Sequence, residues 1–249
     1  MRLALWATAS YAGRLPLEEV MSRALPDVDH VGGDVDRLAL WRDLGERVVL
    51  VALPRPGDLS GMPRGSADLI AAATEAGECV YVPGIGGALV PTVESYGPEG
   101  DQGTQVTWTA YDADPVPVHA LEALSLNELD LRFRQELAEQ TRQIDALDAR
   151  PWSGSPARAM ADSAVSAAGW GLPEGLPPRA LRVMSTASVV SLGTELGLQI
   201  DSPALTSATD ERRRVLLTAL LASADRAVAT AATVGALSIA GMRPGRQDA

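Results

Sequence analysis

Arginine, aspartate and glycine residues gather in three short loops, residues 8–14, 54–58 and 83–87, each of which follows a predicted strand. Arginine binds a carboxylate or phosphate through paired hydrogen bonds, and glycines let backbone N–H groups approach an anion. Ligands of open α/β sheets bind beyond the carboxyl ends of the strands, so we expect the three loops to share one edge of the sheet. The candidate ligand-binding residues are Ser10, Tyr11, Arg14, Arg55, Asp58, Gly84, Gly86 and Gly87. The alternative is three ordinary turns, with Arg55 and Asp58 paired to each other.

A second group, Asp112, Asp114 and His119, follows the last predicted strand. Carboxylate and imidazole groups are metal ligands. Pro115 and Pro117 end the strand here, and aspartates in such turns commonly accept local backbone hydrogen bonds. We therefore predict no metal site and expect these ligand atoms not to converge.

Several enzyme classes lack the residues that their chemistry requires. All 21 basic residues are arginine, which excludes Schiff-base, P-loop and kinase-type lysines. Cys79 is the single cysteine, so neither an intrachain disulfide nor a cysteine-based zinc site is possible. His30 and His119 lie in no Ser-His-Asp or HExxH pattern, and the glycines at 84–87 do not have dinucleotide-binding spacing. We predict no cofactor, and no catalytic residue is identified.

The formal net charge of −11 is concentrated in the middle third of the chain. Eleven acidic residues and no basic residue lie between Arg64 and Arg132. Such a field disfavours nucleic acid and anionic membranes and favours cations or a basic protein partner. The alternative is a solvated acidic face that keeps the protein soluble.

The elements that must position the three loops begin with the aliphatic run at residues 47–53, which is typical of a central strand buried on both faces. A helix to Ala76 and a strand at 79–82 follow, which predicts a right-handed βαβ unit. The run at 3–8 is interpreted as a first strand rather than a signal peptide. Residues 88–96 and 104–111 predict an antiparallel hairpin.

Helical periodicity replaces the strand pattern after about residue 122. A capping box at Ser125 and Glu128 opens a long amphipathic helix, and further helices are expected at 156–168, 179–198 and 209–240. We predict an α/β fold with a mixed, partly parallel sheet, flanking helices and a C-terminal helical region. The expected domains are an α/β core over residues 1–122 and a helical region over 123–249 packed on that core.

The last predicted helix is apolar or small nearly all round beyond Arg226. A helix of this kind must be buried, in a core or against another chain. We therefore expect it to be a packing spine and to lie at or near the interface of a homo-oligomer.

The order strand, Pro54-x-Pro-x-Asp58, helix, strand and Gly84-x-Gly86-Gly87 resembles part of the PAC2 family, whose members are similar to a proteasome-assembly chaperone. The resemblance covers about residues 47–93 and does not extend to the C-terminal half. It implies an assembly or scaffold role and is not taken as family membership.

Taken together, these features predict a non-catalytic binding or assembly protein. The alternative is a small-molecule enzyme with an anionic-ligand pocket at the carboxyl ends of the strands. No segment reaches about 18 apolar residues free of charge, so we expect no transmembrane helix. The remaining expectations are a cytoplasmic location, a small anionic ligand or a basic protein as partner, and no binding to nucleic acid or membrane.

Overall fold

A five-stranded mixed sheet forms the base of the protein in the computed structural model, which describes residues 1–98, 100–147, 171–199 and 207–243. The sheet order is β1-β5-β4-β3-β2, with β1 parallel to β5 and the other neighbours antiparallel. The predicted α/β class with a mixed sheet, flanking helices and a C-terminal helical region is confirmed. The strands are β1 (His30–Gly33), β2 (Leu50–Ala52), β3 (Cys79–Tyr81), β4 (Ala88–Tyr96) and β5 (Gly103–Tyr111).

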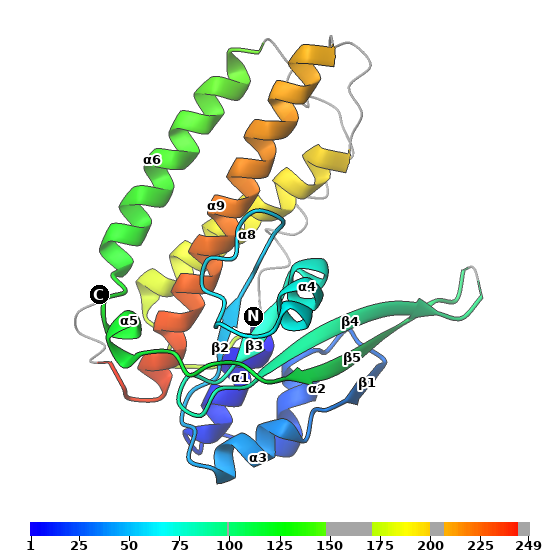
Figure 1. Ribbon diagram of the computed structural model, residues 1–249, viewed down its shortest axis with the longest axis vertical. Coiled ribbons are helices and arrows are strands. Elements are labelled where there is room, and N and C mark those ends of the chain that lie inside the picture. The colour runs from blue at the N-terminus through cyan, green and yellow to red at the C-terminus, as the bar shows by residue number, and fades with distance from the viewer. Residues whose placement is uncertain (99, 148–170, 200–206, 244–249) are drawn as a thin grey trace.

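Helices flank the sheet and extend from it as an arm (Figure 1). The arm is made by α6 (Leu126–Asp145), α8 (Pro178–Gln199) and α9 (Ser207–Ile239), which pack against one another. The shorter helical elements lie around the sheet and are α1 (Arg2–Tyr11), η1 (Leu17–Glu19), α2 (Val20–Ala24), α3 (Arg37–Asp43), α4 (Ala67–Ala76) and α5 (Val118–Glu122). The predicted helix at 156–168 lies outside the described residues.

The N-terminal run forms the helix α1, so the prediction of a first strand at residues 3–8 is wrong. A short apolar run does not by itself distinguish a strand from a buried helix. Thr8 connects this helix to the residue before β2. Its hydroxyl donates to the Val49 carbonyl at 3.1 Å and accepts from the Val49 N–H at 2.9 Å. Thus α1 satisfies backbone groups of the chain that leads into β2, where a strand would have added a ladder.

The run at residues 47–53 lies at the edge of the sheet and not at its centre. Its strand β2 runs antiparallel to β3, with Leu50 opposite Tyr81, so no βαβ unit forms. The reason is the loop at 53–66, which turns back at Arg55 and Asp58 and returns to a bridge between Gly65 and Ala113. The loop therefore makes the return crossing, and α4 then carries the chain forward again before β3 starts.

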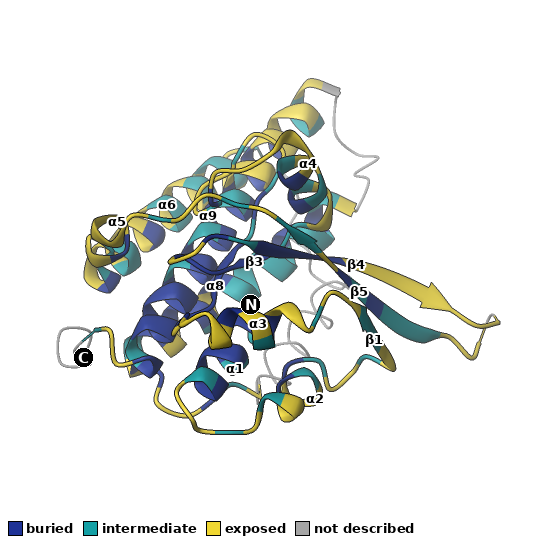
Figure 2. Cartoon of the chain, turned by 60° about the horizontal axis from the view of Figure 1, so that its bottom comes forward, coloured by how far each residue is buried: buried dark blue, intermediate teal, exposed yellow. Residues whose placement is uncertain are grey.

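The predicted hairpin is confirmed as β4 and β5, paired from Ala88–Tyr111 to Tyr96–Gly103. The inner half of β4, residues 88–91, is buried, whereas its outer half is exposed and projects from the body (Figure 2). The strand β3 covers the outer edge of β4 only at Ala88 and Leu89 among the described residues.

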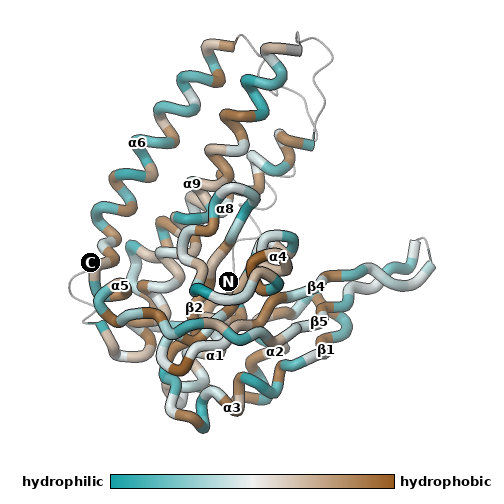
Figure 3. Tube along the Cα trace, in the orientation of Figure 1, coloured by the Kyte–Doolittle hydropathy of each residue, from teal (hydrophilic) through white to brown (hydrophobic). Residues whose placement is uncertain are grey.

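The helix α9 is the packing spine that the sequence predicts. It packs against α8 and α6 in the arm and against β2 and α1 in the body. By length and composition alone, Ala208–Ile239 is the one candidate membrane span among the described residues, but 67% of its most apolar window is buried inside the protein. By contrast, α6 alternates hydrophilic and hydrophobic residues along its length (Figure 3), and its predicted cap is present, with Ser125 Oγ accepting from the Glu128 N–H.

Candidate functional site

The three predicted site loops do not share one edge of the sheet. Because β2 and β3 are antiparallel, the loop after β2 and the loop after β3 leave opposite ends of the pair. Arg55 accordingly lies beside Gly77, at the start of β3, where its Nη1 is 3.7 Å from the position of a Cβ added to that glycine. The prediction that the three loops form one pocket is wrong. That individual residues of these loops bind an anion stays a prediction, which a shared sheet edge no longer supports.

The loop that carries Arg55 and Asp58 is bound to the helical arm. Arg55 donates through Nε to Asp225 at 2.6 Å and through Nη2 to Glu195 at 2.5 Å. Asp58 pairs with Arg226, the next residue of α9. Arg55 and Asp58 are paired to each other only through their backbones, at 2.9 and 2.8 Å, so their side chains join the loop to α8 and α9.

Burial and ion pairing oppose each other at the two carboxylates of this junction. Burial raises the pKa of Asp225, although Ser191 and Arg55 both donate to that carboxylate. At Asp58, burial is outweighed by hydrogen bonds from Ser60 and by Arg226, which lower the pKa of that carboxyl. The guanidinium of Arg55 is thus committed to protein carboxylates.

The glycine loop at 83–87 surrounds a carboxylate of the protein itself. Glu46 is 8% exposed, and its Oε1 accepts the Ile85 N–H at 2.5 Å. A Cβ on Gly84 would lie 2.7 Å from that oxygen, and Gly86 has φ +79° with the Ala113 carbonyl 2.0 Å from its added Cβ. The glycines therefore permit close packing, and the carboxylate that the loop accommodates is that of Glu46.

Ser10, Tyr11 and Arg14 lie at the end of α1 and just beyond it. Tyr11 Oη donates to the Leu38 carbonyl at 2.6 Å, and burial raises the pKa of its phenol. Arg14 donates to the carbonyls of Glu174 at 2.5 Å and Ile239 at 3.3 Å. Ser10 Oγ is buried and has no hydrogen-bond partner among the described residues. The Tyr11 and Arg14 side chains thus hold α1 and the residues after it against their neighbours.

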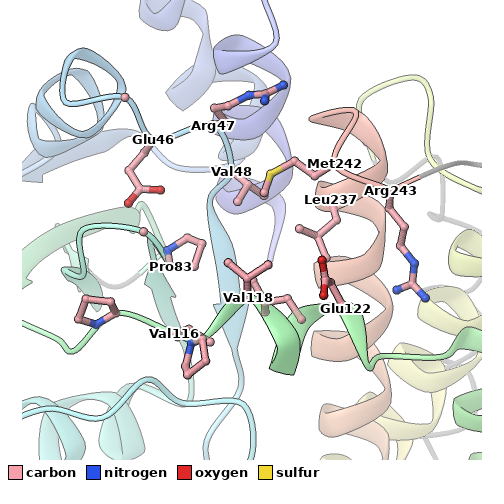
Figure 4. A pocket seen from close by; sticks show the side chains of 15 residues that line it. Glu46, Arg47, Val48, Pro83, Val116, Val118, Glu122, Leu237, Met242 and Arg243 are labelled. Atoms are coloured by element: carbon pink, nitrogen blue, oxygen red, sulfur yellow. The ribbon is translucent and has the colours of Figure 1, made fainter.

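A pocket of about 600 Å³, called the α5 pocket below, opens where the start of β2, the end of β3, α5 and the end of α9 meet (Figure 4). Of the predicted site residues, Gly84 alone lines it. The lining residues come from four separate stretches of the chain and are Gly45, Glu46, Arg47, Val48, Pro83, Gly84, Pro115, Val116, Pro117, Val118, Leu121, Glu122, Leu237, Met242 and Arg243.

Apolar side chains make most of this wall, and two of them are largely exposed. Val118 is 61% and Met242 is 46% exposed, which is unusual for large apolar residues that cluster at a pocket. Two carboxylates and two guanidinium groups balance the formal charge of the lining. Arg47 donates to the Ala240 carbonyl at 3.2 Å, so it fastens the end of α9 rather than pointing freely into the space.

The lining holds no serine, threonine, cysteine, histidine or lysine. The wall therefore offers no hydroxyl, thiol, imidazole or amine group for catalysis, and its carboxylates are those of Glu46 and Glu122. Nowhere in the described ranges do three or more metal-ligating side chains gather around one point, and this includes Asp112, Asp114 and His119. The apolar part of the wall suits contact with an apolar group.

Sequence reasoning missed Glu46 and the apolar wall of this pocket. Glu46 stands between two predicted elements, and its partner Ile85 is 39 positions away. The prolines at 115 and 117 were a usable signal, because they interrupt the strand and turn the chain across the sheet. No spacing rule links that segment to Leu237 and Met242.

Two family models match the chain. The model described as "Rv1486c-like protein, N-terminal domain" matches residues 1–122, and the model described as "Rv1486c-like protein, C-terminal domain" matches residues 127–229. No curated protein and no solved structure matches. Neither matching model is that of the PAC2 family. The resemblance over residues 47–93 is therefore not evidence that the chain belongs to that family.

Proposed function

Because the chain belongs to the Rv1486c-like protein family, whose description names no activity, we propose a function from the α5 pocket. The protein is a non-catalytic binding protein that takes a small, largely apolar molecule carrying one cationic, hydrogen-bond-donating group. The observation that carries the proposal is the buried, positioned carboxylate of Glu46 in a mostly apolar wall.

The volume and the lining support a small organic ligand. Ligand pockets in proteins measure about 300–1,000 Å³ and combine apolar walls with a few fixed polar groups. The α5 pocket, at about 600 Å³, has this size and composition. Its valines, prolines, Leu121, Leu237 and Met242 would cover the apolar body of the ligand.

Glu46 supports the choice of a cationic group. Its Oε1 is held by the Ile85 N–H, whereas its Oε2 receives no hydrogen bond from the part of the chain that the structure describes. A carboxylate that is 8% exposed gains from a donor at this position, and a charge-assisted hydrogen bond is about twice as strong as a neutral one. The net charge of −11 also attracts cations at longer range.

The alternative of an enzyme with an anionic-ligand pocket has lost its geometric basis, since Arg55 and the glycine loop lie at opposite ends of β2 and β3. Self-association, a basic protein partner and a cytoplasmic location stay predictions from the sequence.

The test compares three probes of one chain length, hexylammonium, hexanol and hexanoate, by isothermal titration calorimetry. We expect hexylammonium to bind about tenfold more tightly than hexanol, with hexanoate weakest. Glu46→Gln should abolish the preference for the amine over the alcohol. Val118→Asp should weaken the binding of hexanol and hexanoate, and the matched control Val93→Asp, on the distant hairpin at 64% exposure, should change neither.

Equal binding of hexanoate and hexylammonium to the wild-type protein would refute the role of Glu46. Binding of hexanol and hexanoate to Val118→Asp that is as tight as to the wild type would refute the pocket itself.

A further inference from the structure

A second cavity of about 290 Å³ lies on the other side of α5 from the proposed ligand pocket. It shares Val116 and Leu121 with the α5 pocket, but its remaining wall comes from β2, β3, the loop at 60–62 and one face of α9. We call it the Tyr81 cavity, after the largest polar side chain that lines it.

Tyr81 is a buried polar side chain without a partner. The residue is 4% exposed, and its hydroxyl makes no hydrogen bond with any residue that the structure describes. Burial raises the pKa of this phenol, so the group is a neutral donor at ordinary pH. The hydroxyl oxygen is not one of the fully buried, unpaired polar atoms of the described residues, so it keeps some accessible surface. A tyrosine hydroxyl in such a place usually has a hydrogen-bond partner.

Two threonines of α9 line the same cavity. Thr230 and Thr233 are three residues apart, so they lie on one face of the helix, and Thr233 is 5% exposed. With Ser60 of the loop before Met62, four hydroxyl-bearing residues therefore line the cavity, from three stretches that are far apart in the sequence. Apolar side chains, among them Val51, Met62 and Leu124, make up the rest of the wall.

The charge at the mouth of the cavity is already compensated. Arg226 lines it, but this guanidinium pairs with Asp58 and with Glu136 at 3.8 Å. A charged ligand would have to compete with these pairs. A neutral oxygen acceptor needs only the free hydroxyl donors.

We propose that the Tyr81 cavity is a second binding site, for a small neutral molecule that presents a carbonyl-type oxygen to Tyr81 and the α9 threonines. Its volume corresponds to about ten waters at roughly 30 Å³ each, which is room for a small ring compound. This inference is independent of the α5 pocket and of its cationic ligand.

Two methionines allow the two sites to be observed separately. Met62 lines only the Tyr81 cavity, and Met242 lines only the α5 pocket. NMR spectra of protein carrying ¹³C-methyl methionine therefore report which site a probe enters. The probes are cyclohexanone and methylenecyclohexane, which have the same shape and differ in the oxygen acceptor.

We expect cyclohexanone to shift the Met62 signal and leave the Met242 signal in place. Methylenecyclohexane should bind about tenfold more weakly, because it lacks the oxygen and so loses one hydrogen bond at a buried site. Tyr81→Phe should bring the two affinities together. This variant should be as stable as the wild type, because it removes a hydroxyl that has no protein partner. Thr233→Val, a change of similar shape on α9, should reduce the ketone preference by a smaller factor.

Three results would overturn the proposal. The first is a Met62 signal that neither probe moves, which means that the cavity holds water only. The second is a ketone preference that survives in Tyr81→Phe. The third is a marked loss of stability in Tyr81→Phe, which would show that the hydroxyl already has a structural partner.

Discussion

Replacing Thr8 by valine should destabilise the protein far more than its small change in shape suggests. The Thr8 hydroxyl satisfies both backbone groups of Val49, and both residues are 0% exposed. Valine keeps the shape of the side chain but leaves a buried N–H and a buried C=O without partners. Each of these two groups costs about 1–3 kcal/mol, so we expect a loss of about 2–6 kcal/mol in the free energy of unfolding.

The assay is urea unfolding of wild type, Thr8→Val and Thr8→Ser, followed by circular dichroism. Serine retains the hydroxyl and loses one methyl group, which costs roughly 1 kcal/mol. Thermal unfolding of the same variants gives a second comparison. In a chain of this size, each 1 kcal/mol shifts the melting temperature by about 2–4 °C, so the valine variant should melt well below the serine variant. The reverse order, with serine the less stable, would show that packing and not hydrogen bonding holds α1 against the chain before β2.

Three further predictions concern the loops and α9. Gly86→Ala should cost at least about 2 kcal/mol, because it adds backbone strain to a clash with the Ala113 carbonyl, whereas Gly57→Ala, with φ +86° and open space around it, should cost less in the same unfolding assay. Because burial raises the folded pKa of Asp225 above the ordinary value of an aspartate, its contribution to stability is present below that ordinary pKa and is lost as pH rises through the folded pKa. Asp225→Asn should remove this dependence, which unfolding free energies measured from pH 3 upward would check, and an unchanged pH profile would contradict it. Ala232→Arg, at a site 1% exposed on α9, should unfold the chain or dissociate an oligomer, and sedimentation beside circular dichroism distinguishes these two outcomes from an unaffected protein.

The parts of the fold that local chemistry specifies were predictable. Ser66 caps α4 by accepting the Leu69 N–H, and Gly77 ends it at φ 69°, both as the residue types indicate. The hairpin was predictable because two runs of strand-forming residues flank one glycine-rich loop. In each case the decisive residues are near neighbours in the chain.

The path of the chain between β2 and β3 was not predictable in the same way. A helix between two strands usually marks a parallel pair. Here the loop at 53–66 makes the return crossing, and its position depends on ion pairs of Arg55 and Asp58 with α9, about 170 residues away. The candidate site depends on the same long-range geometry, since the α5 pocket joins Glu46 to Met242.

The glycine loop has a consequence for chemical complementation. Ile85 donates its N–H to the carboxylate of Glu46, and the loop glycines keep that space clear of side chains. Truncation by Glu46→Ala would leave a preformed receptor for a small carboxylate beside an exposed donor. Formate or acetate supplied in the buffer should then restore the lost stability in a concentration-dependent way. Removal of the Glu46 side chain would thereby turn the loop at 83–87 into a binding site for an anion from solution.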